Sequence, residues 1–223
     1  MESSVKHIVT QKKESCLNLE LFDSRIAVGK YQMPFIHKED IIPSGIIDFC
    51  RAISSRDYLK GVHFYLDDYR FERIWKNPFR YIPILKKYHC VFTPDFSIFY
   101  DMPMPMKIWN VYRSRLLGQI MQQSGIRVIP TVSWADSPTF EFCFDGIEPG
   151  GTISLSSVGI GKDTLQKKRY EAGFLAMIEK ISPRTIIEYG DRHIDISDNI
   201  EHIFFKNTTF EWKNKQNNIN YKG

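Results

Sequence analysis

The chain of 223 residues suits one domain, or one domain with a small appendage. Hydrophobic residues make up 43% and charged residues 25%, ordinary values that argue against a disordered or fibrous protein. The formal net charge of +4 is mildly basic, so it permits an anionic partner without requiring one.

The four cysteines are widely spaced and form no Cys-x-x-Cys pair, which predicts reduced thiols in a cytosolic protein. The first residues contain no apolar signal segment, and no stretch reaches the roughly 18 apolar residues of a membrane span. We therefore expect neither export nor membrane insertion, and a cytoplasmic location.

Composition divides the chain into three parts. Residues 1–25 are polar and irregular and are expected to form an N-terminal arm. Residues 26–206 are expected to form a single α/β domain. Residues 207–223 are rich in Asn and Lys, which predicts a flexible C-terminal tail.

Short apolar runs, rich in β-branched or aromatic residues, predict the strands. The clear runs are 62–66, 89–93, 127–132, 152–157 and 185–189, and the run 33–36 is a weaker candidate. Because these runs are apolar throughout instead of alternating, they indicate parallel strands buried on both faces.

The segments between the strands are predicted to be helical. Residues 71–87 are divided before Pro78, which suits a first helical position, and residues 106–124 end where Gly125 suits the position after a helix. The arginines of these helices, Arg70, Arg113 and Arg115 among them, are expected on solvated outer faces. Contact with phosphates is the alternative.

The alternation of strands and helices predicts an α/β fold with a mainly parallel sheet of five or six strands and flanking helices. Two architectures fit this pattern: an open doubly wound sheet and an incomplete β/α barrel. Five or six strands are too few for a complete eight-stranded barrel.

Polar or acidic side chains follow every clear strand. The carboxyl ends of parallel strands meet at one edge, where ligands bind in open α/β folds, so these side chains should converge. The candidate catalytic residues are Asp67, Asp68, Asp95 and Glu188. Any one of the three aspartates, taken alone, is more often a helix cap than a catalyst, whereas capping does not readily explain Glu188 at the end of a strand.

Several carboxylates at one edge suit two kinds of chemistry. Asp67, Asp95 and Glu188 are the candidate ligands of a divalent cation, Mg²⁺ or Mn²⁺. Alternatively, two carboxyl groups with different pKa values act as acid and base. The sequence leaves the identity of any other cofactor open.

The segment Ser133-Trp134-Ala135-Asp136 ends the third clear strand with a hydroxyl, an indole and a carboxylate. Trp134 is predicted to form an apolar wall or a stacking platform for a base or sugar ring. Alternatively, the ring of Trp134 only fills space at the end of the sheet. Ser133, Trp134, Asp136 and, after the fifth strand, Tyr189 are candidate substrate-binding residues.

The segment SSVGIGK, residues 156–162, is similar to a phosphate-binding loop. Gly159 and Gly161 allow backbone N–H groups to approach an anion, and Lys162 adds positive charge. The segment is not a Walker A loop, because a Ser stands where the first Gly is needed and an Asp follows Lys162. We count Ser157, Gly159, Gly161 and Lys162 as candidate substrate-binding residues, although a plain glycine turn explains the segment equally well.

Several segments together resemble one family: FYLDDYRFERIWKNP, VFTPDFSIFYDMP, WNVYRSRLLGQ, GIRVIPTVSWAD, FCFDGIEPGG, SLSSVG and EYG. That family is catalogued as domain of unknown function 4417 and occurs in phages, prophages, plasmids and bacterial chromosomes. The resemblance runs from about residue 62 to residue 190. It implies a phage or mobile-element setting in a bacterial host, and it assigns no activity and no residue role.

Three functions are compatible with these patterns. The first is an enzyme that acts on a phosphate-bearing substrate, a nucleotide or nucleic acid, as a divalent-metal-dependent hydrolase or phosphoryl-transfer enzyme. The second is a non-catalytic binding protein that assists replication of a mobile element or blocks a host defence protein. The third is a carbohydrate-active enzyme, since paired carboxylates and a tryptophan also suit sugar chemistry.

Overall fold

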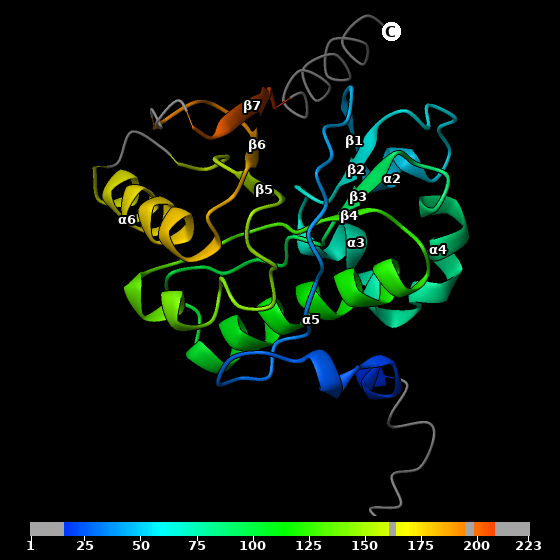
Figure 1. Cartoon of the computed structure of the whole chain (residues 1–223), viewed down its shortest axis with the longest axis horizontal. Coiled ribbons are helices and arrows are strands. Elements are labelled where there is room, and N and C mark those ends of the chain that lie inside the picture. Colours follow the sequence, from blue (N-terminus) through cyan, green and yellow to red (C-terminus); the bar gives the residue numbers. More distant parts are fainter. Residues whose placement is uncertain (1–15, 161–163, 195–198, 208–223) are drawn as a thin grey trace, which may run out of the picture.

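The computed structural model describes residues 16–160, 164–194 and 199–207 and has an α/β architecture (Figure 1). Seven short parallel strands form two sheets, and within each sheet the strand order follows the chain. The first sheet contains β1 (Ile46–Asp48), β2 (Gly61–His63), β3 (Cys90–Phe92) and β4 (Val128–Ile129). The second contains β5 (Thr152–Ser156), β6 (Thr185–Tyr189) and β7 (Glu201–Phe205).

The two sheets meet where β4 passes beside β5. Thr131, just after β4, forms an isolated parallel bridge with Ser154 of β5, and the Val132 N–H donates to the Ser154 carbonyl at 2.8 Å. The strand order therefore runs from β1 to β7 without reversal. A doubly wound sheet reverses its order at a switch point, so the sequential order matches an incomplete β/α barrel.

The inner face of this curved sheet is filled by side chains from strands distant in order. The ring of Tyr65, after β2, stacks on the ring of Tyr189 in β6 with centroids 5.1 Å apart and planes 9° apart. Phe92, Ile129 and Ile187 complete the buried cluster between them. The interior is therefore a packed core.

Helices cover the outer face of the sheet. They are α2 (Phe49–Ala52), α3 (Asp68–Lys76), α4 (Pro78–Leu85), α5 (Met104–Gln123) and α6 (Thr164–Ile181), with the 3₁₀ turns η1 (Leu19–Leu21), η2 (Ser24–Ile26) and η3 (Ser137–Glu141). Pro78 begins α4, as predicted, and the Asn77 side chain accepts a hydrogen bond from the Arg80 N–H at 3.2 Å. Gly125, with φ of 78°, follows the end of α5 and confirms the predicted helix stop.

The sequence patterns did not predict the strands β1 and β7. They also gave residues 33–36 as a candidate strand, which the structure does not form. The strand β1 has only three residues, too few for a period to be visible, and β7 begins with the polar pair Glu201-His202. In the weaker candidate, residues 33–36, Met33 and Ile36 form only isolated bridges. The sheet consequently has more strands than the five or six expected.

The expected solvated position of Arg113 and Arg115 is wrong. Both side chains lie in the interior, because α5 runs across the molecule and is covered along most of its length (Figure 1). Arg113 donates to both oxygens of Glu72 at 3.0 Å. Arg115 is 1% exposed and donates to the backbone carbonyls of Thr131, Cys143 and Asp145.

The described part of the expected N-terminal arm packs against the domain. Leu21 and Phe22 lie against the main core, and the Asn18 amide donates to the Trp75 carbonyl at 2.9 Å. Residues 1–15, and residues 208–223 of the expected tail, lie outside the described residues.

None of the helices described is long and apolar enough to cross a membrane. Cys50, Cys90 and Cys143 are free thiols, and the last two are buried.

Candidate functional site

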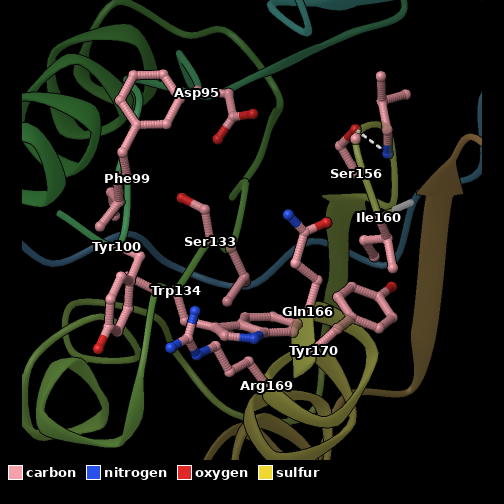
Figure 2. Close-up of a pocket in the computed structure, with 15 residues that line it drawn as sticks. Asp95, Phe99, Tyr100, Ser133, Trp134, Ser156, Ile160, Gln166, Arg169 and Tyr170 are labelled. Atoms are coloured by element: carbon pink, nitrogen blue, oxygen red, sulfur yellow. Dashed lines mark hydrogen bonds between the residues drawn. The ribbon is translucent and has the colours of Figure 1, made fainter. Parts of the chain in front are cut away.

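A cavity of about 300 Å³ opens at the carboxyl ends of β3, β4 and β5 (Figure 2). Asp95 follows β3, Ser133 and Trp134 follow β4, and Ser156 ends β5, so three neighbouring strands supply one side of the cavity. Helix α6 and the segment 98–100 supply the other side. The predicted convergence of strand-end residues is therefore present for these positions, and we call this cavity the aromatic pocket.

Trp134 forms the floor of the aromatic pocket (Figure 2). Its indole stacks on the ring of Tyr170 at 5.4 Å and meets the edge of Phe144 at 6.1 Å. The Tyr170 hydroxyl donates to the buried carboxylate of Glu188 at 2.8 Å, and the other oxygen of Glu188 lies 2.8 Å from His202 Nε2. The pair Glu188–His202 thus fixes the ring on which Trp134 rests.

Gly173 of α6 leaves room for this indole, because a Cβ atom there would lie 2.1 Å from Trp134 Nε1. Gly to Ala in a helix normally stabilises a protein by about 1 kcal/mol. We expect Gly173→Ala instead to lower the free energy of unfolding by about 1–3 kcal/mol, because the ring must move. Urea unfolding measures this change.

The control for this prediction is the same substitution in a Trp134→Leu background, where the colliding ring is absent. There, Gly173→Ala should recover its ordinary stabilising effect. Equal destabilisation in both backgrounds would show that the indole is not what Gly173 accommodates.

Asp95 is the acidic group of the aromatic pocket, above Trp134 in Figure 2. Burial raises the pKa of Asp95 to about 7; the charge of Asp68 adds to the rise, whereas a hydrogen bond from Ser133 and the charge of Arg115 oppose it. A carboxyl group that titrates near neutral pH exists in both protonation states under working conditions. Asp95 is therefore suited to accept and return a proton.

Arg169 of α6 supplies positive charge at the opposite wall. Its guanidinium lies 3.6 Å from the centroid of the Tyr100 ring, which holds the side chain over the pocket. Within residues 16–160, 164–194 and 199–207, Arg169 forms no ion pair with an acidic side chain. Its charge is therefore available to an anionic ligand.

A second cavity of about 260 Å³ adjoins the first, and we call it the polar pocket. Asp67, Arg70, Tyr65 and Tyr189 line it, and Asp95 lines both cavities. Asp67 precedes α3, but its side chain forms no capping hydrogen bond with the helix. Helix capping, which is the usual role of an Asp before a helix, therefore does not explain Asp67.

Two other predicted residues have structural partners. Asp68 accepts hydrogen bonds from the backbone N–H and the hydroxyl of Ser97, which ties α3 to the segment after β3. Asp136 lies 3.6 Å from the Nζ of Lys107, a buried lysine that also donates to the Tyr100 carbonyl. Both carboxylates thus fix segments that shape the aromatic pocket, and neither lines it.

The structure separates Glu188 from the other candidate carboxylates. Side chains alternate between the two faces of a strand, so Glu188 and Tyr189 point in opposite directions. Tyr189 faces the interior and lines the polar pocket, whereas Glu188 faces α6, is 1% exposed and lines neither pocket. Among the described residues, no three His, Cys, Asp or Glu side chains are grouped so that they could hold a metal ion.

The glycine segment is described only in part, since Gly161 and Lys162 lie outside the described residues. The buried Ser157 hydroxyl donates to the Asp191 carbonyl at 2.8 Å and is thus used within the fold. Gly159, with φ of 94°, lines the aromatic pocket, and no atom lies within 4 Å of the position that a Cβ would take. Its backbone is therefore open to a ligand.

The sequence patterns did not indicate the residues that close the aromatic pocket from the other side. These are Phe99, Tyr100, Gln166, Arg169 and Tyr170. Only the basic run Lys167-Lys168-Arg169 was a visible signal, and such a run more often marks a solvated helix face. Which of the three cations turns toward the pocket depends on how α6 packs.

The fold and the site together define an α/β protein of the incomplete-barrel kind, with a ligand-sized cavity at the carboxyl ends of its strands. The family model described as Domain of unknown function (DUF4417) matches residues 26–207. The chain belongs to this family, as its sequence segments indicated.

The relatives of this chain include proteins of bacteriophages. It is 39% identical over 202 residues to the "Gene 1 protein" of Mycobacterium phage L5, covering 87% of this chain and 86% of that protein. It is 38% identical over 183 residues to the "Gene 1 protein" of Mycobacterium phage D29, covering 80% of this chain and 66% of that protein. No solved structure matches the chain. These findings make it a phage-type protein, and they name no substrate.

Proposed function

We propose that this protein is an enzyme that binds a nucleotide, or a nucleotide unit of a nucleic acid, in the aromatic pocket. The observation that carries the proposal is the combination of Trp134, Arg169 and Asp95 in one cavity. An indole face stacks on a planar base, a guanidinium binds a phosphate, and a carboxyl group that titrates near pH 7 transfers a proton. These three components together suit a hydrolase or a phosphoryl-transfer enzyme.

The exposed Asp67 carboxylate suits a supporting role in the polar pocket. Mg²⁺ is often held by one or two protein carboxylates together with substrate phosphates, so a complete cage of protein ligands is not needed. Asp67 is the residue that would hold Mg²⁺ or Mn²⁺ against a bound phosphate, and Glu188 is not part of this proposal. A substrate of this class belongs to the cytoplasm of the bacterial host.

Replacing Trp134 with leucine tests the proposal by binding. Base stacking on an aromatic ring contributes about 1–3 kcal/mol, so Trp134→Leu should weaken binding of 5′-nucleoside monophosphates by roughly 5–150-fold. Calorimetric titration, with and without Mg²⁺, measures the dissociation constants. Trp109→Leu is the matched control, because Trp109 stacks on Tyr112 of the same helix and does not line the pocket.

Two results would overturn the proposal. One is that none of the four nucleoside monophosphates, and no single-stranded oligonucleotide, binds the wild-type protein. The other is that Trp134→Leu and Trp109→Leu weaken binding equally.

A binding protein without catalysis is the second candidate, and the exposed rings beside the pocket favour it. Phe99 is 61% exposed and Tyr100 is 56% exposed, which is unusual for large aromatic side chains. Such a protein would bind nucleotides or single strands through Trp134 and leave them chemically unchanged. Chromatography of the nucleotides after incubation with the protein separates the two candidates.

A further inference from the structure

The aromatic pocket and the polar pocket are adjacent and share part of their walls. Asp95, Ser156 and Val158 line both cavities. The backbone turn after β5 separates the two cavities, and internal hydrogen bonds fix it. The Ser156 hydroxyl accepts from the Val158 N–H at 3.2 Å and donates to the Tyr189 carbonyl at 3.3 Å. A ligand that extends past this turn therefore occupies both cavities.

The polar pocket has its own means of binding an anion. Arg70 lies in the first turns of α3 and lines this pocket but not the aromatic one. In the described part of the chain, its guanidinium has no acidic partner within ion-pair distance. A half-buried arginine without a carboxylate partner is suited to a phosphate, which it can bind through two parallel hydrogen bonds.

Neither cavity alone is large enough for a long ligand. Their volumes, about 300 and 260 Å³, lie at or below the lower end of the range for small-molecule sites. Each is thus suited to one unit of a repeating ligand. Because Asp95 lines both cavities, the bond that joins two such units would pass the carboxyl group to which the proposed function assigns proton transfer.

We infer that the substrate is a single-stranded nucleic acid that occupies both cavities with successive nucleotides. One base stacks on Trp134, the linking phosphodiester passes Asp95 and the turn at Ser156, and Arg70 binds the 5′-phosphate of the preceding nucleotide in the polar pocket. A single strand fits because its bases are free to leave their neighbours and enter a pocket. This inference rests on the proposed function and deepens it, since a free mononucleotide places its base and its phosphate in the aromatic pocket and makes no contact with Arg70.

The test compares a mononucleotide with a dinucleotide that carries a 5′-phosphate, in both deoxyribose and ribose forms. Wild-type protein should bind one of the dinucleotides at least tenfold more tightly than the matching mononucleotide, and the preferred sugar distinguishes DNA from RNA. Arg70→Gln should reduce this preference at least fivefold and leave mononucleotide binding within twofold of wild type. Arg80→Gln, an equal charge change at an exposed position of α4, should alter neither affinity.

The outcomes separate this inference from the proposed function. Mononucleotide binding that depends on Trp134, without any preference for the dinucleotide, overturns the inference and leaves the proposed function standing. The inference is also overturned when Arg70→Gln weakens the binding of mononucleotide and dinucleotide equally, because Arg70 then binds the nucleotide in the aromatic pocket. Absence of binding by every ligand overturns both. Melting temperatures of the two variants within about 2 °C of wild type show that the fold is retained.

Discussion

Replacing Arg115 with methionine should lower the free energy of unfolding by about 3–5 kcal/mol. The wild-type guanidinium donates to the carbonyls of Thr131 at 2.9 Å, Cys143 at 2.8 Å and Asp145 at 3.0 Å. Methionine fills similar space but donates no hydrogen bond, so three carbonyls lose their partner, at about 1–3 kcal/mol for each that stays dry. Burial lowers the pKa of Arg115 to about 10, so the side chain remains charged at neutral pH.

Urea unfolding and thermal melting measure the effect of Arg115→Met. For a chain of this length, the loss corresponds to a decrease of roughly 10 °C in melting temperature. Arg184→Met is the control, because that side chain is 71% exposed and its nearest carboxylate oxygen lies 3.6 Å away, a geometry that contributes at most about 1 kcal/mol. Equal losses in the two variants would contradict the structural role of Arg115.

Replacing Asp95 with asparagine should stabilise the protein at pH 8 and strongly reduce the proposed catalytic activity. The folded-state pKa of Asp95 is raised from 3.8 to about 7, so between these values the folded protein binds this proton more tightly than the unfolded chain does. The contribution of Asp95 to stability therefore becomes less favourable as pH rises from about 4 to 7. At 1.36 kcal/mol for each pKa unit, the full cost is up to about 4 kcal/mol at pH 8.

Asparagine cannot ionise, so Asp95→Asn should unfold with a shallower pH dependence than wild type. The two proteins should have similar stability near pH 4 and differ most at pH 8, as urea titrations at several pH values will show. Any phosphoryl-transfer or hydrolytic activity should fall by at least about 100-fold, while nucleotide binding persists. Asp101→Asn, in the exposed loop nearby, is the control for both measurements.

A destabilised Asp95→Asn variant would instead identify Asp95 as a structural residue. That outcome would remove the proton-transfer component from the proposed function. It would leave the binding role of Trp134 intact, because the nucleotide titration does not depend on the protonation of Asp95.

Much of the site could be predicted from strand ends alone. Asp95, Ser133 and Trp134 each lie within two residues of the end of an apolar run, and parallel strands bring such positions together whichever helices connect them. Glu188 was the exception. Its position at the end of an apolar run predicted that Glu188 lies at the carboxyl edge of the sheet with the other carboxylates. Because β6 is buried on both faces, its sequence does not alternate between apolar and polar residues and does not show which way each side chain points.

The sequence by itself determined the parallel α/β class, several helix boundaries and the polar edge of the sheet. These features depend on local properties: runs of apolar residues, a proline at a helix start, a glycine after a helix end. Only the tertiary structure decided that the strands follow one another without reversal, that Arg115 is buried and that Arg169 of α6 reaches the pocket of Trp134. Those features depend on how distant segments pack, which no local pattern in a single chain specifies.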